Sequence, residues 1–165
     1  MERALQEGAG RGAAELVADL RGSVERLLDE ATAVPAEPRP TPVTALAGRR
    51  HPAWFTLHRA WRELETHHVD LRLGHTTADW PVDYVTWALD GTIAALTARG
   101  FPVAHIEATD LNRAWSPAPT GPAVTGPGHV LLAWPTGRDG HAGLQWDLPL
   151  PTPPAWPLPP APGWS

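Results

Sequence analysis

The sequence predicts an α+β protein in which a helical N-terminal half precedes a small mixed C-terminal half. Two observations predict this division. Up to residue 100, apolar side chains recur at steps of three and four, which is the period of an amphipathic helix. Beyond residue 100, short alternating segments and Gly-Pro turns replace that pattern. We therefore expect a helical domain over residues 1–100, a small α+β domain over 101–150 and a proline-rich tail over 151–165.

Three helices are expected in the first domain. The first spans residues 13–30, and a linker with five prolines follows over 35–52. The second runs from about Pro52 to Leu71 and ends at Gly74, whereas the third has Asp79 as its N-cap and ends at Gly100. The residues expected to face inward are Leu57, Ala60, Trp61, Leu64, His68 and Leu71 in the second helix, and Val82, Val85, Leu89, Ile93 and Leu96 in the third.

The second domain is expected to combine short strands with one helix. Residues 101–110 predict a strand in which Val103, His105 and Glu107 share one face. Residues 120–138 predict a strand, a Gly-Pro turn and a short helix, and residues 143–150 predict a last strand. Eight of the final seventeen residues are prolines, so the tail is expected to be extended rather than helical.

The composition excludes several classes of function. A formal net charge of −5 argues against a nucleic-acid partner, which normally requires a basic face. The chain contains no cysteine, so a disulfide, a thiolate metal ligand and a cysteine nucleophile are all excluded. No run approaches the roughly 18 apolar residues of a membrane helix, and the N-terminus lacks the apolar core of a signal peptide. We expect a cytoplasmic protein.

The stretch WRELETHHVDL, residues 61–71, combines three carboxylates with two imidazoles. On a helix, Glu63 and His67 are four residues apart and project from one face, so an oxygen and a nitrogen can bind one divalent ion. His68 lies about 100° further round the helix and cannot easily share that ion. Asp70, three residues after His67, is placed to orient the His67 ring as a hydrogen-bond partner that does not itself bind the metal. The alternative is a solvated surface on which Glu63 pairs with Arg59 or Arg62, and the spacing alone leaves both interpretations open.

The segment from Arg62 to Leu71 resembles the R-E-x-E-x-H-H-x-D-L signature of the mycothiol-dependent maleylpyruvate isomerase family, whose metal-binding domain is a DinB-like four-helix bundle. The resemblance continues through Gly74 and Asp79-Trp80-Pro81, then Asp110 with Trp115, and later Val124-Thr125-Gly126-Pro127, Leu131-Leu132-Ala133-Trp134 and Thr136-Gly137-Arg138. Pro135 departs from the family pattern and is expected to shorten its helix because proline removes a hydrogen bond.

The resemblance implies a zinc ion held by Glu63, His67 and a third histidine from an earlier helix. That third ligand has no counterpart in this sequence, because the family's two first helices, one of which carries the histidine, are not matched. His51 and His58 are the only upstream histidines, and neither lies at a matching position. We therefore expect a truncated bundle with exposed apolar stripes. A misassigned start, completion by a second copy or a separate N-terminal segment, or a degenerate relative without metal would each explain the difference.

The resemblance also implies the reaction. Zinc would assist the addition of the external thiol mycothiol to the cis double bond of an unsaturated keto-dicarboxylate, and the bond would rotate before the thiol leaves. Arg138 resembles the family's active-site arginine, and a guanidinium suits carboxylate capture; the alternative is that it neutralises a helix C-terminus. The rival functions are a mycothiol S-transferase of the same fold and a non-catalytic module that binds small molecules or other proteins.

Overall fold

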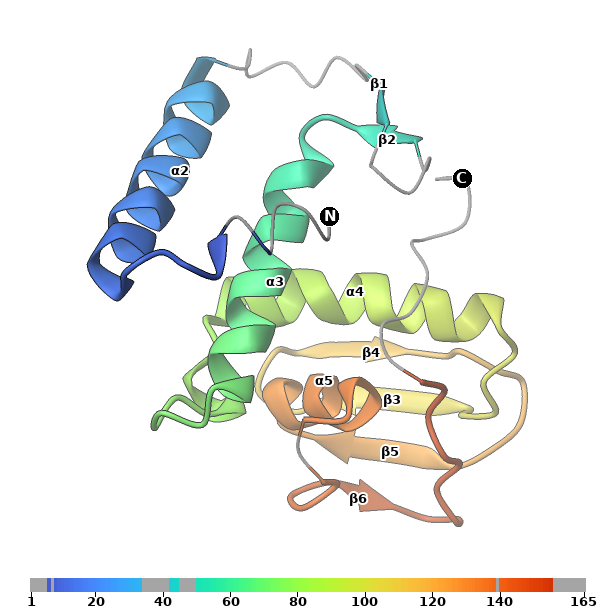
Figure 1. Cartoon of the computed structure of the whole chain (residues 1–165). Helices are drawn as coiled ribbons and strands as arrows, with labels where there is room; N and C mark the ends of the chain where they lie inside the picture. The colour runs from blue at the N-terminus through green and yellow to red at the C-terminus, as the bar shows by residue number, and fades with distance from the viewer. Residues whose placement is uncertain (1–5, 7, 34–41, 45–49, 139, 156–165) are drawn as a thin grey trace. The chain divides into compact units, whose positions relative to one another are not determined.

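The computed structural model describes residue 6 and residues 8–33, 42–44, 50–138 and 140–155 (Figure 1). The chain divides into two compact units, residues 1–41 and 42–165, and each is described by itself. The α+β class expected from the sequence is confirmed, because helices and two small sheets make up the described chain. Among the described residues, no helix has the length and hydropathy that a membrane crossing requires.

The first unit consists mainly of the helix α2 (Ala13–Ala33), which confirms the helix expected over 13–30 and extends it by three residues. Glu15 lies in its first turn, where a negative charge is favoured by the helix dipole. Arg11 holds this end by donating to Glu15 Oε1 at 2.9 Å and to Asp19 Oδ2 at 3.0 Å. No residue of α2 is buried, and its exposed apolar side chains are Leu16, Val17, Leu20, Val24 and Leu28.

The second unit begins with a hairpin that the sequence analysis missed. Strands β1 (Pro42–Thr44) and β2 (Arg50–Pro52) pair antiparallel, with Val43 opposite His51. The linker predicted over 35–52 is therefore wrong at these six residues, and residues 34–41 and 45–49 lie outside the described part. His51 is buried because its ring packs edge-on against Phe55, with ring centroids 5.5 Å apart.

Helix α3 (Phe55–Asp70) confirms the second predicted helix, but its expected inner face is only partly right. Trp61 packs against the core as expected, whereas the other large members are exposed: Leu57, Leu64, His68 and Leu71. Leu64 and Leu71 are each 63% exposed, while the buried positions are Phe55 and Thr66. α3 contacts α4 through Trp61, whose ring lies 5.5 Å from that of Tyr84 and 6.3 Å from that of Trp87, measured between centroids. The indole N–H of Trp80 also holds α3 by donating to the backbone oxygen of Glu65 at 3.1 Å.

The connection from α3 to α4 contains a short 3₁₀ helix, η1 (Thr77–Asp79). Asp79 does not cap α4 (Val82–Ala98), as the sequence analysis had it; its carboxylate instead accepts from the backbone N–H and the hydroxyl of Thr76, each at 2.8 Å. Four of the five inward positions predicted for α4 are buried, and Val82 is 61% exposed because it lies in the first turn, at the edge of the packed region. Gly100 ends the helix region with φ +65°.

The C-terminal part forms a four-stranded sheet in the order β4-β3-β5-β6. Its strands are β3 (His105–Ala108), β4 (Arg113–Trp115), β5 (Ala123–Gly126) and β6 (Gln145–Trp146). β3 pairs antiparallel with β4 and parallel with β5, and β6 is antiparallel to β5. The strands predicted within 101–110, 120–138 and 143–150 are all present.

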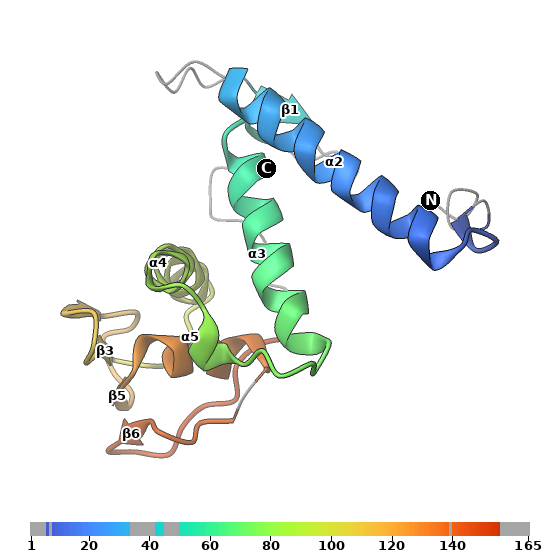
Figure 2. The same cartoon turned by 90° about the vertical axis from the view of Figure 1, so that its left-hand side faces the viewer.

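Helices α4 and α5 (Gly128–Thr136) cover one face of this sheet, as the two views show (Figures 1 and 2). The core between them contains Leu89, Leu96, Val103, Val124 and Leu132, all at most 1% exposed. α4 and the sheet both contribute side chains to this core, and α3, α4 and the sheet lie in one compact unit. The domain boundaries expected at residues 100 and 150 stay a prediction.

Candidate functional site

Glu63 and His67 lie side by side on the outer face of α3, as their spacing predicted. Glu63 Oε2 and His67 Nε2 are 3.3 Å apart, and the two side chains are 56% and 64% exposed. Arg62 also feels this carboxylate: burial lowers the pKa of the Arg62 guanidinium overall, and the charge of Glu63 opposes this by raising that pKa. One turn of helix therefore presents an oxygen and a nitrogen toward the same point in space.

Asp70 orients His67, as expected. His67 Nδ1 lies 3.0 Å from Asp70 Oδ2, so the tautomer with a proton on Nδ1 donates to this carboxylate. The lone pair of Nε2 then faces Glu63 Oε2, which is also an electron-pair donor. Two such donors lie close together without repulsion only when a proton or a metal ion lies between them.

Arg138 connects this cluster to the C-terminal part of the chain. Its Nη2 donates to Asp70 Oδ2 at 3.0 Å, although the two residues are 68 positions apart in sequence. Its Nη1 donates to the backbone oxygen of Thr136 at 2.8 Å, and its Nε donates to that of Thr66 at 3.4 Å. The Arg138 side chain is only 11% exposed. The two interpretations of Arg138 are therefore compatible, since it contacts a carbonyl at the end of α5 and also reaches the candidate site.

The end of α5 sets the position of Arg138. Pro135 lies in the last turn of the helix, which stops one residue later, and Gly137 closes it in the left-handed region at φ +69°. The backbone N–H of Arg138 then returns to the oxygen of Ala133 at 3.3 Å. This closure directs the guanidinium toward α3.

The carboxylate of Asp70 is the electrostatic centre of the cluster. Burial, the largest single effect, raises its pKa, but hydrogen bonds and charges from His67 and Arg138 outweigh it. The net result is a pKa below the ordinary aspartate value. Asp70 is therefore ionised at neutral pH and can hold His67 and Arg138 at the same time.

His68 points elsewhere, as predicted. Its ring stacks on that of His75, with centroids 3.8 Å apart and planes 7° from parallel. His75 Nε2 lies 3.7 Å from Glu65 Oε2, and Trp61 Nε1 donates to the other oxygen of Glu65 at 3.0 Å. Sequence reasoning missed His75 because its position beside His68 depends on the turn after α3.

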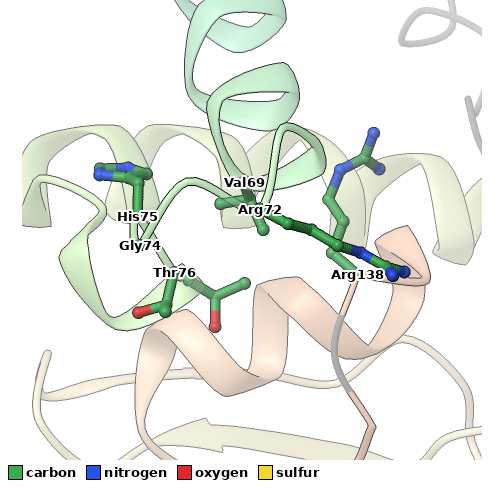
Figure 3. Close-up of a pocket in the computed structure, with 7 residues that line it drawn as sticks. Val69, Arg72, Gly74, His75, Thr76 and Arg138 are labelled. Carbon is green, nitrogen blue, oxygen red and sulfur yellow. The ribbon is translucent and has the colours of Figure 1, made fainter.

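Two hollows flank the cluster. The larger, of about 420 Å³, is lined by Glu63, Leu64, Glu65, His67, His68 and Leu71. The smaller, of about 300 Å³, is lined by Val69, Arg72, Gly74, His75, Thr76, Thr77 and Arg138 (Figure 3). The first borders the Glu63–His67 pair, and the second shares Arg138 with the Asp70 network. Sequence reasoning did not single out Arg72.

The Glu63–His67 pair fits two positions of a zinc site. Zinc bonds to nitrogen and oxygen measure about 2.0–2.1 Å, so two ligand atoms at the tetrahedral angle lie roughly 3.3–3.4 Å apart. The observed 3.3 Å agrees with this spacing. However, no group of three or more His, Cys, Asp or Glu suitable for a metal exists among the described residues. His51 is buried beside Phe55, and the ring of His58 is tilted against that of Trp87 with centroids 4.8 Å apart, so both histidines belong to other contacts.

The remaining candidates fall outside the cluster. His105 Nε2 and Glu107 Oε2 are 3.5 Å apart on the sheet, which confirms that they share a face. Trp80 is buried and Trp54, Trp61 and Trp87 are half-buried, in agreement with a structural role.

Comparison with known proteins gives the context for this cluster. Residues 2–72 match the family model described as the mycothiol maleylpyruvate isomerase N-terminal domain. No match is found among curated proteins. Two solved structures share the fold: the mycothiol-dependent maleylpyruvate isomerase, with a TM-score of 0.70, and a histidine-to-alanine variant of such an enzyme, with a TM-score of 0.69. Each is 24% identical over 94% of this chain.

The chain spans 66% of the length of each of these two proteins, slightly less than two thirds. The matched residues 2–72 contain Glu63, His67 and Asp70, whereas Arg138 lies in the part that only the structural comparison covers. Residues 2–72 therefore resemble the N-terminal domain of the mycothiol maleylpyruvate isomerase family, and 94% of the chain shares the fold of the two solved structures.

Proposed function

We propose that the chain takes part in a mycothiol-dependent cis–trans isomerisation of an unsaturated keto-dicarboxylate, with zinc bound at Glu63 and His67. The observation that carries the proposal is the 3.3 Å separation of Glu63 Oε2 and His67 Nε2. Asp70 supports it by holding His67 through Nδ1 at 3.0 Å. A cytoplasmic location accords with a small thiol as cofactor and stays a prediction.

Glu63 and His67 would supply two of the metal's ligands. A third has to come from beyond the described residues, either from a second copy of the chain or from another segment. When bound, zinc supplies a Lewis acid that lowers the pKa of a coordinated thiol. The thiol supplies a nucleophile whose addition turns the cis double bond into a single bond that can rotate, and whose departure leaves the trans isomer with no net change in atoms.

The chain's own residues would position the metal and the substrate. Asp70 keeps the proton of His67 on Nδ1, which leaves the Nε2 lone pair free for the metal. Arg138, fixed by Thr136 and Thr66 carbonyls, holds a guanidinium beside the same cluster for a substrate carboxylate. Because the chain has no cysteine, the thiol has to come from outside the chain.

The metal assignment is tested by zinc titration of the purified chain in competition with a chromophoric chelator. Glu63→Ala and His67→Ala should each weaken zinc binding by about tenfold or more, since each removes a ligand. His68→Ala is the matched control, because its ring stacks on His75 and should leave the affinity nearly unchanged. Equal zinc affinity in all three variants would contradict the assignment.

The reaction is tested by following the conversion of maleylpyruvate to fumarylpyruvate with zinc and mycothiol present. Conversion should require both, and His67→Ala should abolish it. Sedimentation in the same buffer tests the source of the missing ligand: one zinc per two chains in a dimer supports completion by a second copy. A zinc-loaded chain that conjugates mycothiol without isomerising the substrate would instead be an S-transferase.

A non-catalytic binding or interaction module is the second candidate. It is favoured by the lack of a third ligand among the described residues. It is also favoured by three exposed leucines at seven-residue spacing, Leu57 and Leu64 of α3 and Leu71 at its C-cap. A chain that binds no zinc at millimolar metal would support this alternative.

A further inference from the structure

The smaller hollow, beside the turn that follows α3, is lined by two arginines. Arg72 comes from the turn and Arg138 from the end of α5. In the close-up, both side chains extend to the same side of the hollow, away from His75 (Figure 3). A volume of about 300 Å³ lies at the lower end of the range for small-molecule sites, roughly 300–1,000 Å³.

The two guanidinium groups differ in their partners. Arg138 is fixed by the carboxylate of Asp70 and by two backbone oxygens. Arg72 has no side-chain hydrogen bond or ion pair to any described residue, although its backbone N–H donates to Val69 at 3.0 Å. The hydroxyl of Thr76, another lining residue, is already donated to Asp79. Arg72 is therefore the uncompensated positive charge of the hollow.

The backbone of Arg72 adds a second observation. Arg72 has φ +54°, in the left-handed region that residues other than glycine, asparagine and aspartate rarely occupy. Glycine would occupy this position with less strain, and Gly74 does so two residues later at φ +96°. A long cationic side chain at a strained position beside a cavity suggests a binding role.

We infer that this hollow binds a small dicarboxylate. Arg72 holds the carboxylate that lies farther from Asp70, and this contact makes the hollow prefer anions with two carboxylates to anions with one. Arg138 holds the other carboxylate. Two guanidinium groups match two carboxylates in number and in fork geometry. The choice of a dicarboxylate as the anion rests on the proposed function. For the proposed isomerisation, Arg72 is then a specificity residue outside the Glu63–His67 pair.

The test is calorimetric titration of the whole chain at pH 7 in low salt with EDTA, using maleate, acetate and inorganic phosphate as probes. Maleate should bind about tenfold or more tightly than acetate. Arg72→Gln should weaken maleate about tenfold and acetate much less, because a charge-assisted contact to one of the two carboxylates is lost. Arg99→Gln is the matched control, since Arg99 is an exposed arginine after α4, and it should change nothing.

A second variant separates binding from folding. Arg72→Gly should unfold at the same temperature or higher, because it removes backbone strain, and should still lose maleate affinity. The inference is overturned if Arg72→Gln binds maleate as the unchanged chain does, or if phosphate binds more tightly than maleate. Because no metal or thiol is present, loss of zinc binding or of isomerisation would refute the proposed function without affecting this result.

Discussion

Replacing Asp70 by asparagine tests the network that joins α3 to the end of α5. The substitution keeps the shape of the side chain but removes the negative charge of the carboxylate. Oδ2 of this carboxylate lies 3.0 Å from His67 Nδ1 and 3.0 Å from Arg138 Nη2. The carboxylate is 41% exposed, so solvent screens the ion pair and its contribution falls in the range of about 0.2–1 kcal/mol for exposed pairs. Arg138 retains its two carbonyl contacts, so we expect Asp70→Asn to lower the free energy of unfolding by about 0.5–1 kcal/mol.

The effect on zinc should be larger than the effect on stability. An asparagine can offer its NH₂ group to His67 and favour the wrong tautomer, which places a proton on Nε2. Changes in the groups that orient metal-binding histidines typically cost about 10–100-fold in affinity. We expect a zinc affinity lower by roughly tenfold, measured by the chelator competition described above.

The pH dependence gives a further check with a defined sign. The pKa of Asp70 is lower in the folded chain than in the unfolded chain, where aspartate has a pKa of about 3.9. The unfolded state therefore binds the proton more readily, and the stabilisation is complete above about pH 4 and is lost as the pH falls through the folded-state pKa. The difference in unfolding free energy between the unchanged chain and Asp70→Asn should be present at pH 7 and shrink below pH 4.

Chemical denaturation at each pH measures this difference. Asp29→Asn is the control, because Asp29 is an exposed aspartate of α2 without a side-chain ion pair in the described structure. The reasoning is refuted if Asp70→Asn leaves both the zinc affinity and the unfolding free energy unchanged at pH 7.

Two further predictions concern the scaffold that holds the site. Gly121→Ala should destabilise the chain by about 3 kcal/mol or more, because φ is +134° and a Cβ would lie 2.3 Å from the backbone oxygen of Pro102. Gly91→Ala is the control, because Gly91 lies inside α4 with open space around it. This variant should be neutral or stabilising by up to about 1 kcal/mol. Equal thermal midpoints for these two variants would contradict the packing described. Asp110→Ala should cost about 1 kcal/mol in urea unfolding, because Asp110 Oδ1 accepts from the first N–H of α5, at Gly128, over 2.7 Å. An unchanged urea midpoint would show that water replaces this contact.

Local relations in the candidate site followed from the sequence. Glu63 and His67 are four residues apart on a helix, and Asp70 follows three residues later, so all three side chains project from one face. The contacts among them therefore follow from helix geometry alone. The same argument correctly directed His68 away from the pair. The expected inner face of α3 was right at Trp61 and wrong at Leu64 and Leu71, because periodicity locates an apolar stripe but does not state which part of it a neighbouring element covers.

The sequence by itself predicted the helices α2 to α5 and the strands β3, β5 and β6. It also predicted the Glu63–His67 pair on α3 and the resemblance of residues 62–71 to the isomerase family. Only the tertiary structure decided that Arg138 reaches Asp70 and that Arg72 lies at the rim of a hollow. The physical reason is that hydrogen bonding within a helix fixes neighbours three and four residues apart. The contact between residues 70 and 138 depends instead on how α4, α5 and the sheet pack around one shared core.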